Sequence, residues 1–510
     1  MNNQEQVLQV NNKYVEDFKK IQELMSKTMD TYCAEFLEKK GLESPLSEKY
    51  LEKTKEQLTA CAGDKEYAEI VNSYLQSFHQ GHLFLKESDE TKPQDDKQVF
   101  PLIVKYEDGK YIGVSNDANI DGQVISEING IPITEYVQTH TFDQGHRTFS
   151  FDKDGILYNP EFQINEDTCT LTTQDGTIQS LETISAQEAI GLKKQEIANE
   201  QKELGIKLAE GIDGNELLSN VVCGYTRDGI PYIKIRKFDK NSKEADKIKI
   251  EQFAGQLKDR EQTDLIIDIR GNGGGTDEYI EYLGAFSDGE YERQEQFKSL
   301  IGLNGKEANE IFGQTQDIDI ALERLENNPT REVEKYTPKI PNGNSSITHR
   351  LLLIDGEVFS GADKFTKLAK DSGFATVVGS QPTAGDGEGF TTYSVDTPIL
   401  REQGLSITMP SSMGLDYSEF QTIPDIMVNE HEINTNLGQI MKQTKDTIIE
   451  WEEAPITQKQ DNIANNYVEA SLQYGQGQLG GQALNQSGIN GQMGNSTNSV
   501  PSMSNGGPHR

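Results

Sequence analysis

The chain has 510 residues, and its 83 Asp and Glu against 48 Lys and Arg give a formal net charge of −35. A chain of this length is expected to form about two to four domains. So large an acidic excess argues against general nucleic-acid binding, which needs Lys and Arg for the phosphates, and against docking on anionic lipid. No apolar stretch approaches a membrane span, and no secretory signal is visible, so a cytoplasmic location is expected.

The first half of the chain predicts a helical region, a β-rich unit and a helical linker. Residues 1–90 carry apolar residues at helical spacing. Residues 95–185 alternate short apolar runs with turns, including a strand, turn and strand over 122–133 and a helix from about residue 134. Residues 186–220 begin with a polar helix-forming stretch that predicts a linker.

Residues 221–445 predict an α/β core, because strands at 232–235, 265–269, 351–354 and 375–378 alternate with helices at 245–257 and 361–370. Such alternation indicates a parallel sheet with crossover helices. Residues 446–510 predict a disordered tail rich in Gln, Gly, Asn and Ser, in which Arg510 is the only charged side chain after Glu469. The cysteines are far apart without a C-x-x-C pair, so buried free thiols are expected at Cys33, Cys61, Cys169 and Cys223.

Three Gly-rich or turn segments follow predicted strands. The first is 268–275, whose glycines suit an oxyanion or a phosphate, although it matches neither a P-loop nor a dinucleotide fingerprint. In the second, Ser360 precedes a predicted helix, where it is either an N-cap or a nucleophile with the Gly361 N–H as oxyanion donor. The third is 379–389, which is a weak signal alone.

Metal sites are weighed and set aside. His79 and His82 would share a helix face, but no third ligand is near in sequence, and a general base is the better use of one histidine. Residues 117–122 copy the first half of a calcium-binding EF-hand loop, yet Ile128 stands where the loop's last Glu should be. Neither motif is therefore expected to bind a metal.

The order of these motifs resembles the C-terminal processing (tail-specific) and tricorn-core serine peptidases. The run LIIDIRGNGG at 265–274 resembles the family signature I-I-D-L-R-x-N-x-G-G, and FSGAD at 359–363 is similar to its nucleophile segment. Further similarities, spread over about residues 75–435, are QGH at 80–82, a PDZ-like segment at 125–133, VGSQPTAG at 378–385 and SEFQTIPDI at 418–426.

The resemblance implies an α/β fold class: a ClpP/crotonase-like layered α/β core with an N-terminal helical segment and a small β-rich PDZ-like unit. It implies a serine endopeptidase in which Ser360 is the nucleophile, His82 the general base and Glu419 the third member. The implied oxyanion donors are the N–H groups of Gly361 and of Gly273 or Gly274. The implied acyl-transfer mechanism needs no metal and no organic cofactor. The substrate would be a polypeptide, and homo-oligomer formation stays open.

Two departures from the family pattern keep alternatives open. Asp386 stands at the lysine of the Ser–Lys branch, which favours the tricorn-type branch, and Gly81 replaces the serine that precedes the histidine there. Lys364, four residues after Ser360, is expected to face solvent or to pair with a carboxylate. The alternatives are an inactive protein that binds peptides or an apolar ligand on the same fold, and an acyl-transfer enzyme acting on a thioester.

Overall fold

A computed structural model describes most of the chain between residues 3 and 453. The described ranges are 3–30, 33–38, 41–78, 80–87, 98–99, 103–107, 110–114, 120, 122–133, 149–152, 155–158, 168–182, 184–299, 316–327, 333–385, 392–410, 412–414 and 421–453. Within these ranges, no helix combines the length and apolar character that crossing a membrane requires.

Helices precede the first strand, as the spacing of apolar residues predicted. They are α1 (Asn3–Thr28), the π-helix η1 (Cys33–Leu37), α3 (Glu48–Ala60) and α4 (Asp64–Gln76). Helix α3 has Ser47 as its N-cap, and the Ser47 hydroxyl accepts a hydrogen bond from the Tyr50 N–H. Phe18, Leu24 and Tyr74 are fully buried between the helices. This buried face is what holds the helices together.

The N-terminal helices share their apolar core with segments from much later in the chain. The strand β1 (Phe84–Glu87) belongs to a four-stranded sheet of order β1-β24-β23-β18, with β24 (Leu405–Pro410), β23 (Thr392–Asp396) and β18 (Gln316–Asp317). Helices α10 (Ile318–Asn327) and α12 (Pro398–Glu402) bury side chains in the same cluster as α1 and α4. The described residues at 316–327 and 392–410 therefore pack with the N-terminal helices, although the sequence assigned them to the α/β core.

The region predicted to be β-rich consists of short strands. They are β2 (Gln98–Val99), β3 (Ile103–Glu107), β4 (Lys110–Val114), β5 (Ile125–Ile128), β6 (Ile131–Pro132), β7 (Phe149–Asp152), β8 (Gly155–Tyr158), β9 (Thr168–Thr173), β10 (Ile178–Glu182) and β11 (Ile184–Ser185). The predicted strand, turn and strand are β5, Asn129-Gly130 with positive φ, and β6. The helix predicted from residue 134 lies outside the described residues, and the PDZ-like assignment stays a prediction.

The predicted polar helix of the linker is α6 (Ala186–Leu204). It begins with a capping box in which the Ser185 hydroxyl accepts from the Glu188 N–H while the Glu188 carboxylate accepts from the Ser185 N–H. It ends at Gly205, whose φ of 64° is a left-handed conformation that glycine adopts without strain. Local capping thus fixes both ends of the helix.

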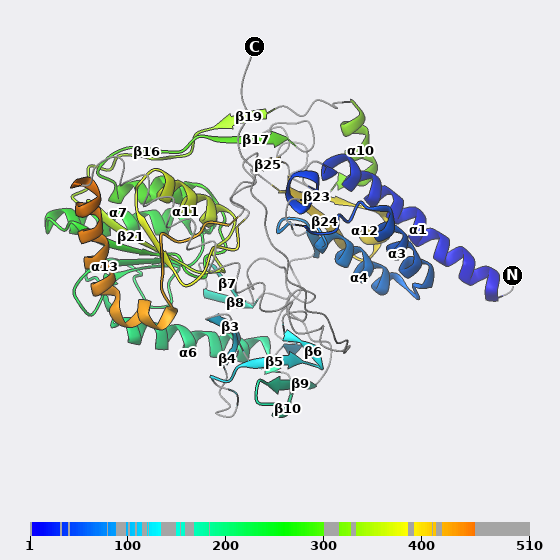
Figure 1. The fold of residues 1–510 in the computed structure, drawn as a ribbon, viewed down its shortest axis with the longest axis horizontal. Helices are drawn as coiled ribbons and strands as arrows, with labels where there is room; N and C mark the ends of the chain where they lie inside the picture. Colours follow the sequence, from blue (N-terminus) through cyan, green and yellow to red (C-terminus); the bar gives the residue numbers. More distant parts are fainter. Residues whose placement is uncertain are drawn as a thin grey trace, which may run out of the picture. The chain divides into compact units, whose positions relative to one another are not determined.

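A seven-stranded sheet forms the centre of the α/β core (Figure 1). In spatial order its strands are β12 (Lys207–Leu208), β13 (Val221–Tyr225), β14 (Pro231–Ile235), β15 (Asp264–Asp268), β21 (His349–Ile354), β22 (Thr376–Gly379) and β26 (Ile426–Met427). The strands from β14 to β26 are parallel, whereas β12 and β13 are antiparallel to their neighbours. The predicted α/β fold class, with its parallel strands, is confirmed.

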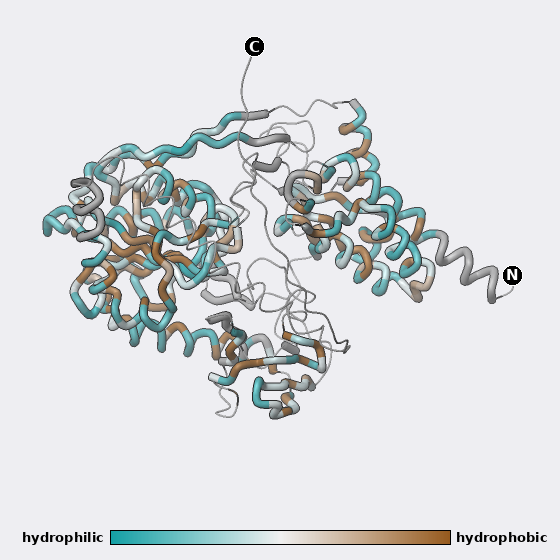
Figure 2. The backbone as a smooth tube through the Cα atoms, in the orientation of Figure 1, coloured by the Kyte–Doolittle hydropathy of each residue, from teal (hydrophilic) through white to brown (hydrophobic). Residues whose placement is uncertain are grey.

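Side chains of the central strands alternate between two helical layers, which explains why the strands read as continuous apolar runs. Leu265 and Ile267 of β15 pack in the cluster that includes α7 (Lys243–Asp259), α8 (Glu278–Leu283) and α11 (Gly361–Asp371). Ile266 points into the other cluster, with α13 (Glu430–Glu453). Figure 2 shows this concentration of hydrophobic residues along the central strands.

The remaining described elements are small. They are the 3-10 helix η4 (Gly284–Phe286), the pair β16 (Tyr291–Glu292) and β20 (Lys339–Ile340), and a three-stranded sheet of order β19-β17-β25 formed by β19 (Val333–Tyr336), β17 (Glu295–Ser299) and β25 (Ser412–Gly414).

Two further sequence predictions are decided in part. Helix α13 continues to Glu453, past residue 446 where the tail was predicted to begin, and the rest of the tail lies outside the described residues. The four cysteines are buried free thiols, as predicted.

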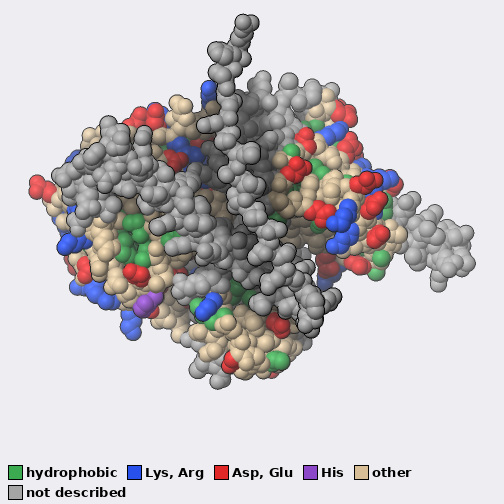
Figure 3. Space-filling view, viewed as in Figure 1, with side chains coloured by type: hydrophobic (Ala, Val, Ile, Leu, Met, Phe, Trp, Pro, Cys, Tyr) green, Lys and Arg blue, Asp and Glu red, His purple; other side chains and the backbone are tan. Residues whose placement is uncertain are grey.

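Acidic and basic side chains are interspersed on the described surface in Figure 3, so the acidic excess is not gathered in one patch of that face.

Candidate active site

Ser360 lies at the junction between the turn after β21 and the first residue of α11. Its backbone has φ 54° and ψ −125°, a conformation that L-residues rarely adopt. Its side chain makes no capping hydrogen bond to the helix, so the interpretation of Ser360 as an ordinary N-cap is wrong. A strained residue of this kind costs about 1–3 kcal/mol and persists only where the surrounding structure enforces it.

The surrounding structure here is the two Gly-rich loops that the sequence singled out. The Ser360 N–H donates to the Gly385 carbonyl at 3.0 Å, and the Phe359 N–H donates to the Asn272 carbonyl at 3.1 Å. The Ala384 N–H donates to the Val358 carbonyl at 2.8 Å. All three predicted segments therefore converge on the strained serine.

His82 reaches the same place from the turn after α4. Its Nε2 lies 3.0 Å from Ser360 Oγ, within hydrogen-bond reach. Its ring stacks on Phe359 with centroids 4.9 Å apart and an interplanar angle of 29°. The Gln80 side-chain oxygen accepts the His82 backbone N–H at 2.6 Å. The stacking on Phe359 orients the imidazole ring, and the hydrogen bond to Gln80 holds the His82 backbone.

Gly274 lies directly against the segment around Ser360. A Cβ atom at this position would lie 2.5 Å from the Phe359 carbonyl oxygen and 2.7 Å from the Gly361 nitrogen. Its own N–H donates to Asn272 Oδ1 at 2.8 Å, and Asn272 Nδ2 donates to the Ile235 carbonyl at 3.0 Å. The glycine at 274 therefore supplies space for the serine segment, while its N–H stabilises the loop.

Substitution of Gly274 by Ala should disrupt the site, because the new Cβ meets backbone atoms that cannot move aside and φ is 85°. Gly271→Ala is the matched control: φ is also positive, at 72°, but the nearest atom to its Cβ is a Glu357 side-chain oxygen at 3.4 Å. We expect the control to lose about 1–2 kcal/mol of stability from strain alone. Gly274→Ala should lose considerably more stability and nearly all reaction with a fluorophosphonate. Urea denaturation measures the stability and labelling measures the reaction with the fluorophosphonate. Equal losses in the two variants would contradict the special role of Gly274.

Lys364 is buried, so the expectation that it faces solvent is wrong and the expectation of a carboxylate partner is confirmed. Its Nζ lies 2.6 Å from Asp277 Oδ2 and 4.4 Å from the centre of the Tyr336 ring. Glu419, Asp386 and His79 lie outside the described residues, so their roles stay predictions.

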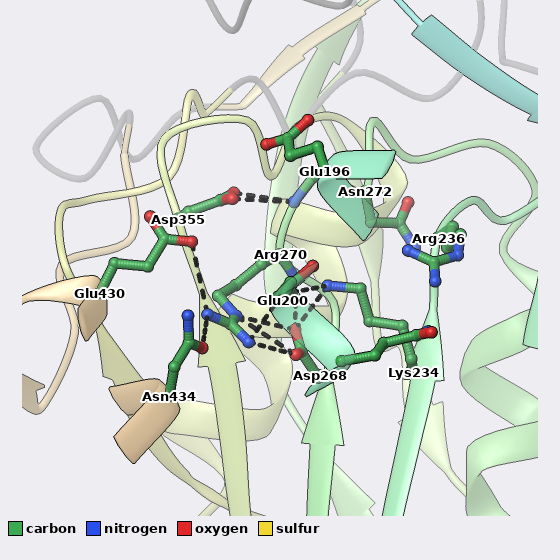
Figure 4. Close-up of polar contacts among 12 residues, drawn as sticks. Glu196, Glu200, Lys234, Arg236, Asp268, Arg270, Asn272, Asp355, Glu430 and Asn434 are labelled. Carbon is green, nitrogen blue, oxygen red and sulfur yellow. Dashed lines mark hydrogen bonds and ion pairs between the residues drawn. The ribbon is translucent and has the colours of Figure 1, made fainter. Parts of the chain in front are cut away.

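A buried charged cluster, which sequence reasoning missed, lies under the Gly-rich loop (Figure 4). Asp268 at the end of β15 is fully buried and accepts hydrogen bonds from Lys234 Nζ at 3.0 Å and Arg270 Nη2 at 2.7 Å. Arg270 also contacts Glu200 of α6 at 3.0 Å and Glu430 of α13 at 3.4 Å. The sequence signals were the single Asp within an apolar strand and the Arg of the run LIIDIRGNGG, but neither showed that the two side chains form a buried cluster.

Burial by itself would raise the pKa of Asp268, because it removes water from the carboxylate. The positive charges of Arg270 and Lys234 outweigh that effect and hold the pKa below its usual range. Asp268 is therefore ionised, and the cluster joins α6, the sheet and α13 at the base of the loop that carries Gly273 and Gly274.

Part of the chain matches a known family model, and its fold is similar to solved structures. Residues 229–428 match the family model described as Peptidase family S41. The structure of mature CPAF complexed with lactacystin is similar with a TM-score of 0.57 at 14% identity, covering 86% of this chain and 98% of that chain. The crystal structure of mature CPAF gives 0.56 at 14% identity, covering 86% and 97%.

The photosystem II D1 C-terminal processing protease gives a TM-score of 0.38 at 12% identity, covering 81% of this chain and 93% of that chain. Among curated proteins, no relative matches the chain. At these identities the two CPAF structures show a shared fold.

Proposed function

Residues 229–428 form a peptidase family S41 domain, and we propose that the protein is a serine endopeptidase in which Ser360 is the nucleophile and His82 the general base. The observation that carries the proposal is the 3.0 Å separation between His82 Nε2 and Ser360 Oγ, at a serine whose strained backbone is enforced by two loops. Paired nucleophile and base at this distance are typical of acyl-transfer enzymes.

In the proposed reaction, Ser360 Oγ attacks the carbonyl carbon of a peptide bond as His82 Nε2 takes the hydroxyl proton. His82 then returns that proton to the departing amine, leaving an acyl-serine. Water attacks the acyl-serine by the same steps, with His82 again accepting and then donating a proton, so the free serine and a carboxylate are released. The substrate class is a polypeptide.

The proposed oxyanion donors are the N–H groups of Gly361 and Gly273. Gly361 is the first residue of α11, and the first N–H groups of a helix have no acceptor within the helix. Between the two candidate glycines of the loop, Gly273 is preferred, because the Gly274 N–H already donates to Asn272. One such donor contributes about 10²–10³ in rate.

A fluorophosphonate probe tests the proposal, because it forms a bond only with an activated serine. We expect wild-type protein to be labelled at Ser360, as located by mass spectrometry, and His82→Ala to reduce the labelling rate by about 10²–10⁴-fold. The matched control is His431→Ala, an exposed histidine at the start of α13, which should label like wild type. Lactacystin, which is bound in the similar CPAF complex, can be tested as a second probe.

A different outcome would favour the alternative that the protein binds peptides on this fold without cleaving them. If the wild-type protein is not labelled by either probe but retains peptides on a column, the chain is a binding protein that has kept the fold without the chemistry. Equal labelling of wild type and His82→Ala would instead remove His82 from the proposed site and leave Ser360 with another base.

A further inference from the structure

The loop that carries Gly273 and the turn that leads to Ser360 are joined by one carboxyl group. Asp355 directly follows β21, five positions before Ser360. Its two carboxylate oxygens each lie 3.0 Å from the Gly271 nitrogen, and Oδ1 also accepts the Glu357 N–H at 3.0 Å. One side chain therefore accepts hydrogen bonds from the first glycine of the Gly-rich loop and from the backbone of the turn that leads to Ser360.

This placement contributes to the separation of the two proposed oxyanion donors, together with the hydrogen bond from the Phe359 N–H to the Asn272 carbonyl. Gly273 lies two residues after the bonded Gly271, and Gly361 lies four residues after the bonded Glu357. Each donor must reach the same oxygen atom, so a small shift of one loop relative to the other weakens both hydrogen bonds.

We propose that Asp355 is a positioning residue that aligns the oxyanion loop with Ser360 only while its carboxyl group is ionised. The inference rests on the proposed acyl-transfer function. An ionised carboxylate makes hydrogen bonds roughly twice as strong as those of a neutral acceptor. A proton on Asp355 replaces one acceptor lone pair by a donor, which loosens the connection between the two loops.

The surroundings of Asp355 place its titration in the neutral range. Loss of water around the carboxyl raises its pKa, and the negative charges of Glu357 and Glu430 raise the pKa further, to about 7. The Gly271 N–H and the charge of Lys234 act in the opposite direction. Figure 4 shows Glu430 beside Asp355, with Arg270 between Glu430 and Asp268.

A raised pKa also has a defined consequence for stability. The folded protein holds a proton on Asp355 that the unfolded chain releases near pH 4, so this group contributes stability below about pH 4 that is lost as the pH rises to about 7. The ionised form that the reaction needs is thus the less stable form. Asp355→Asn should therefore be at least as resistant to unfolding as wild type at about pH 8, while reacting more slowly.

The test compares labelling rates of wild type and Asp355→Asn by a fluorophosphonate between about pH 5 and about pH 9. Any dependence on His82 is common to both proteins and cancels in the ratio of the two rates. We expect the ratio of wild type to variant to rise by about tenfold as the pH passes through about 7, because only the wild type gains the ionised carboxylate. Asp425→Asn is the matched control: Asp425 also accepts a backbone N–H, from Val377 at 2.8 Å, but bonds neither loop, so its ratio should stay flat.

Glu357→Gln tests the same point without changing Asp355. Removing this like charge lowers the pKa of Asp355, so the variant should label faster than wild type on the acidic side of about pH 7. A flat ratio for Asp355→Asn with an active wild type, or no acidic shift for Glu357→Gln, overturns the role of Asp355 alone. A wild type that does not label at any pH removes the proposed function, and this role with it.

Discussion

Ser360→Ala is expected to abolish cleavage of an unstructured polypeptide such as casein, with kcat falling by about 10⁴–10⁶-fold. In the proposed reaction, alanine removes the oxygen that forms the acyl bond, and the neighbouring His82 has no nucleophile left to activate. KM should change little, because the oxyanion donors and the loops that hold the backbone of residue 360 remain. The rate of peptide release measures kcat, and the fluorophosphonate should no longer label the protein.

The control for this variant is Ser372→Ala, at the opposite end of the same helix. Ser372 is the C-cap of α11, and its hydroxyl donates to the Leu368 carbonyl at 2.6 Å. The same atom is removed from the same helix, so only a local loss of about 0.5–1.5 kcal/mol is expected, with turnover unchanged. Residual cleavage by Ser360→Ala above about one part in 10³ would point to a different nucleophile.

The sequence predicted those parts of the fold that depend on local patterns. The strands β15, β21 and β22 were recognisable because both of their faces are buried, which makes them continuous apolar runs. Helix α6 was recognisable as a polar helix-forming stretch, although its caps Ser185 and Gly205 were not predicted. The segments around Ser360 could be identified because a short turn between a strand and a helix needs residues of restricted type.

Contacts between distant parts of the chain left no such signal. The pairing of β1 with β24 joins residues more than 300 positions apart, and apolar alternation in either strand does not name its partner. The hydrogen bond from the Gly274 N–H to Asn272 was equally unpredictable from the sequence. A run of glycines presents several N–H groups, and only the folded geometry decides which of them donates to Asn272. The distance from His82 to Ser360 could be inferred only through the family resemblance.

Asp268→Asn should destabilise the protein by about 3–5 kcal/mol, since breaking one partner of a buried ion cluster leaves the opposite charges without compensation. Asp268 is fully buried and accepts from the Tyr232 hydroxyl at 2.8 Å as well as from Lys234 and Arg270. The asparagine amide would turn an NH₂ group toward some of these donors. Urea denaturation at about pH 7 measures the loss, and peptide cleavage should fall with it, because the cluster supports the start of the Gly-rich loop.

The pH dependence of this loss has a definite sign. The lowered pKa of Asp268 means that its stabilisation is present above the unfolded-state pKa of about 4 and is lost as the pH falls further. The difference between wild type and Asp268→Asn should therefore be full at neutral pH and shrink in acid.

The exposed pair of Lys20 and Asp319, with Nζ and Oδ2 2.6 Å apart, provides the matched substitution. Asp319→Asn should cost no more than about 1 kcal/mol, because water screens the charges and replaces the lost contact. If Asp268→Asn costs no more than this control, then Glu200 and Glu430 alone compensate Arg270 and Lys234. Asp268 would then be dispensable to the cluster, and the alignment of the Gly-rich loop would depend on Asp355 and Asn272 instead.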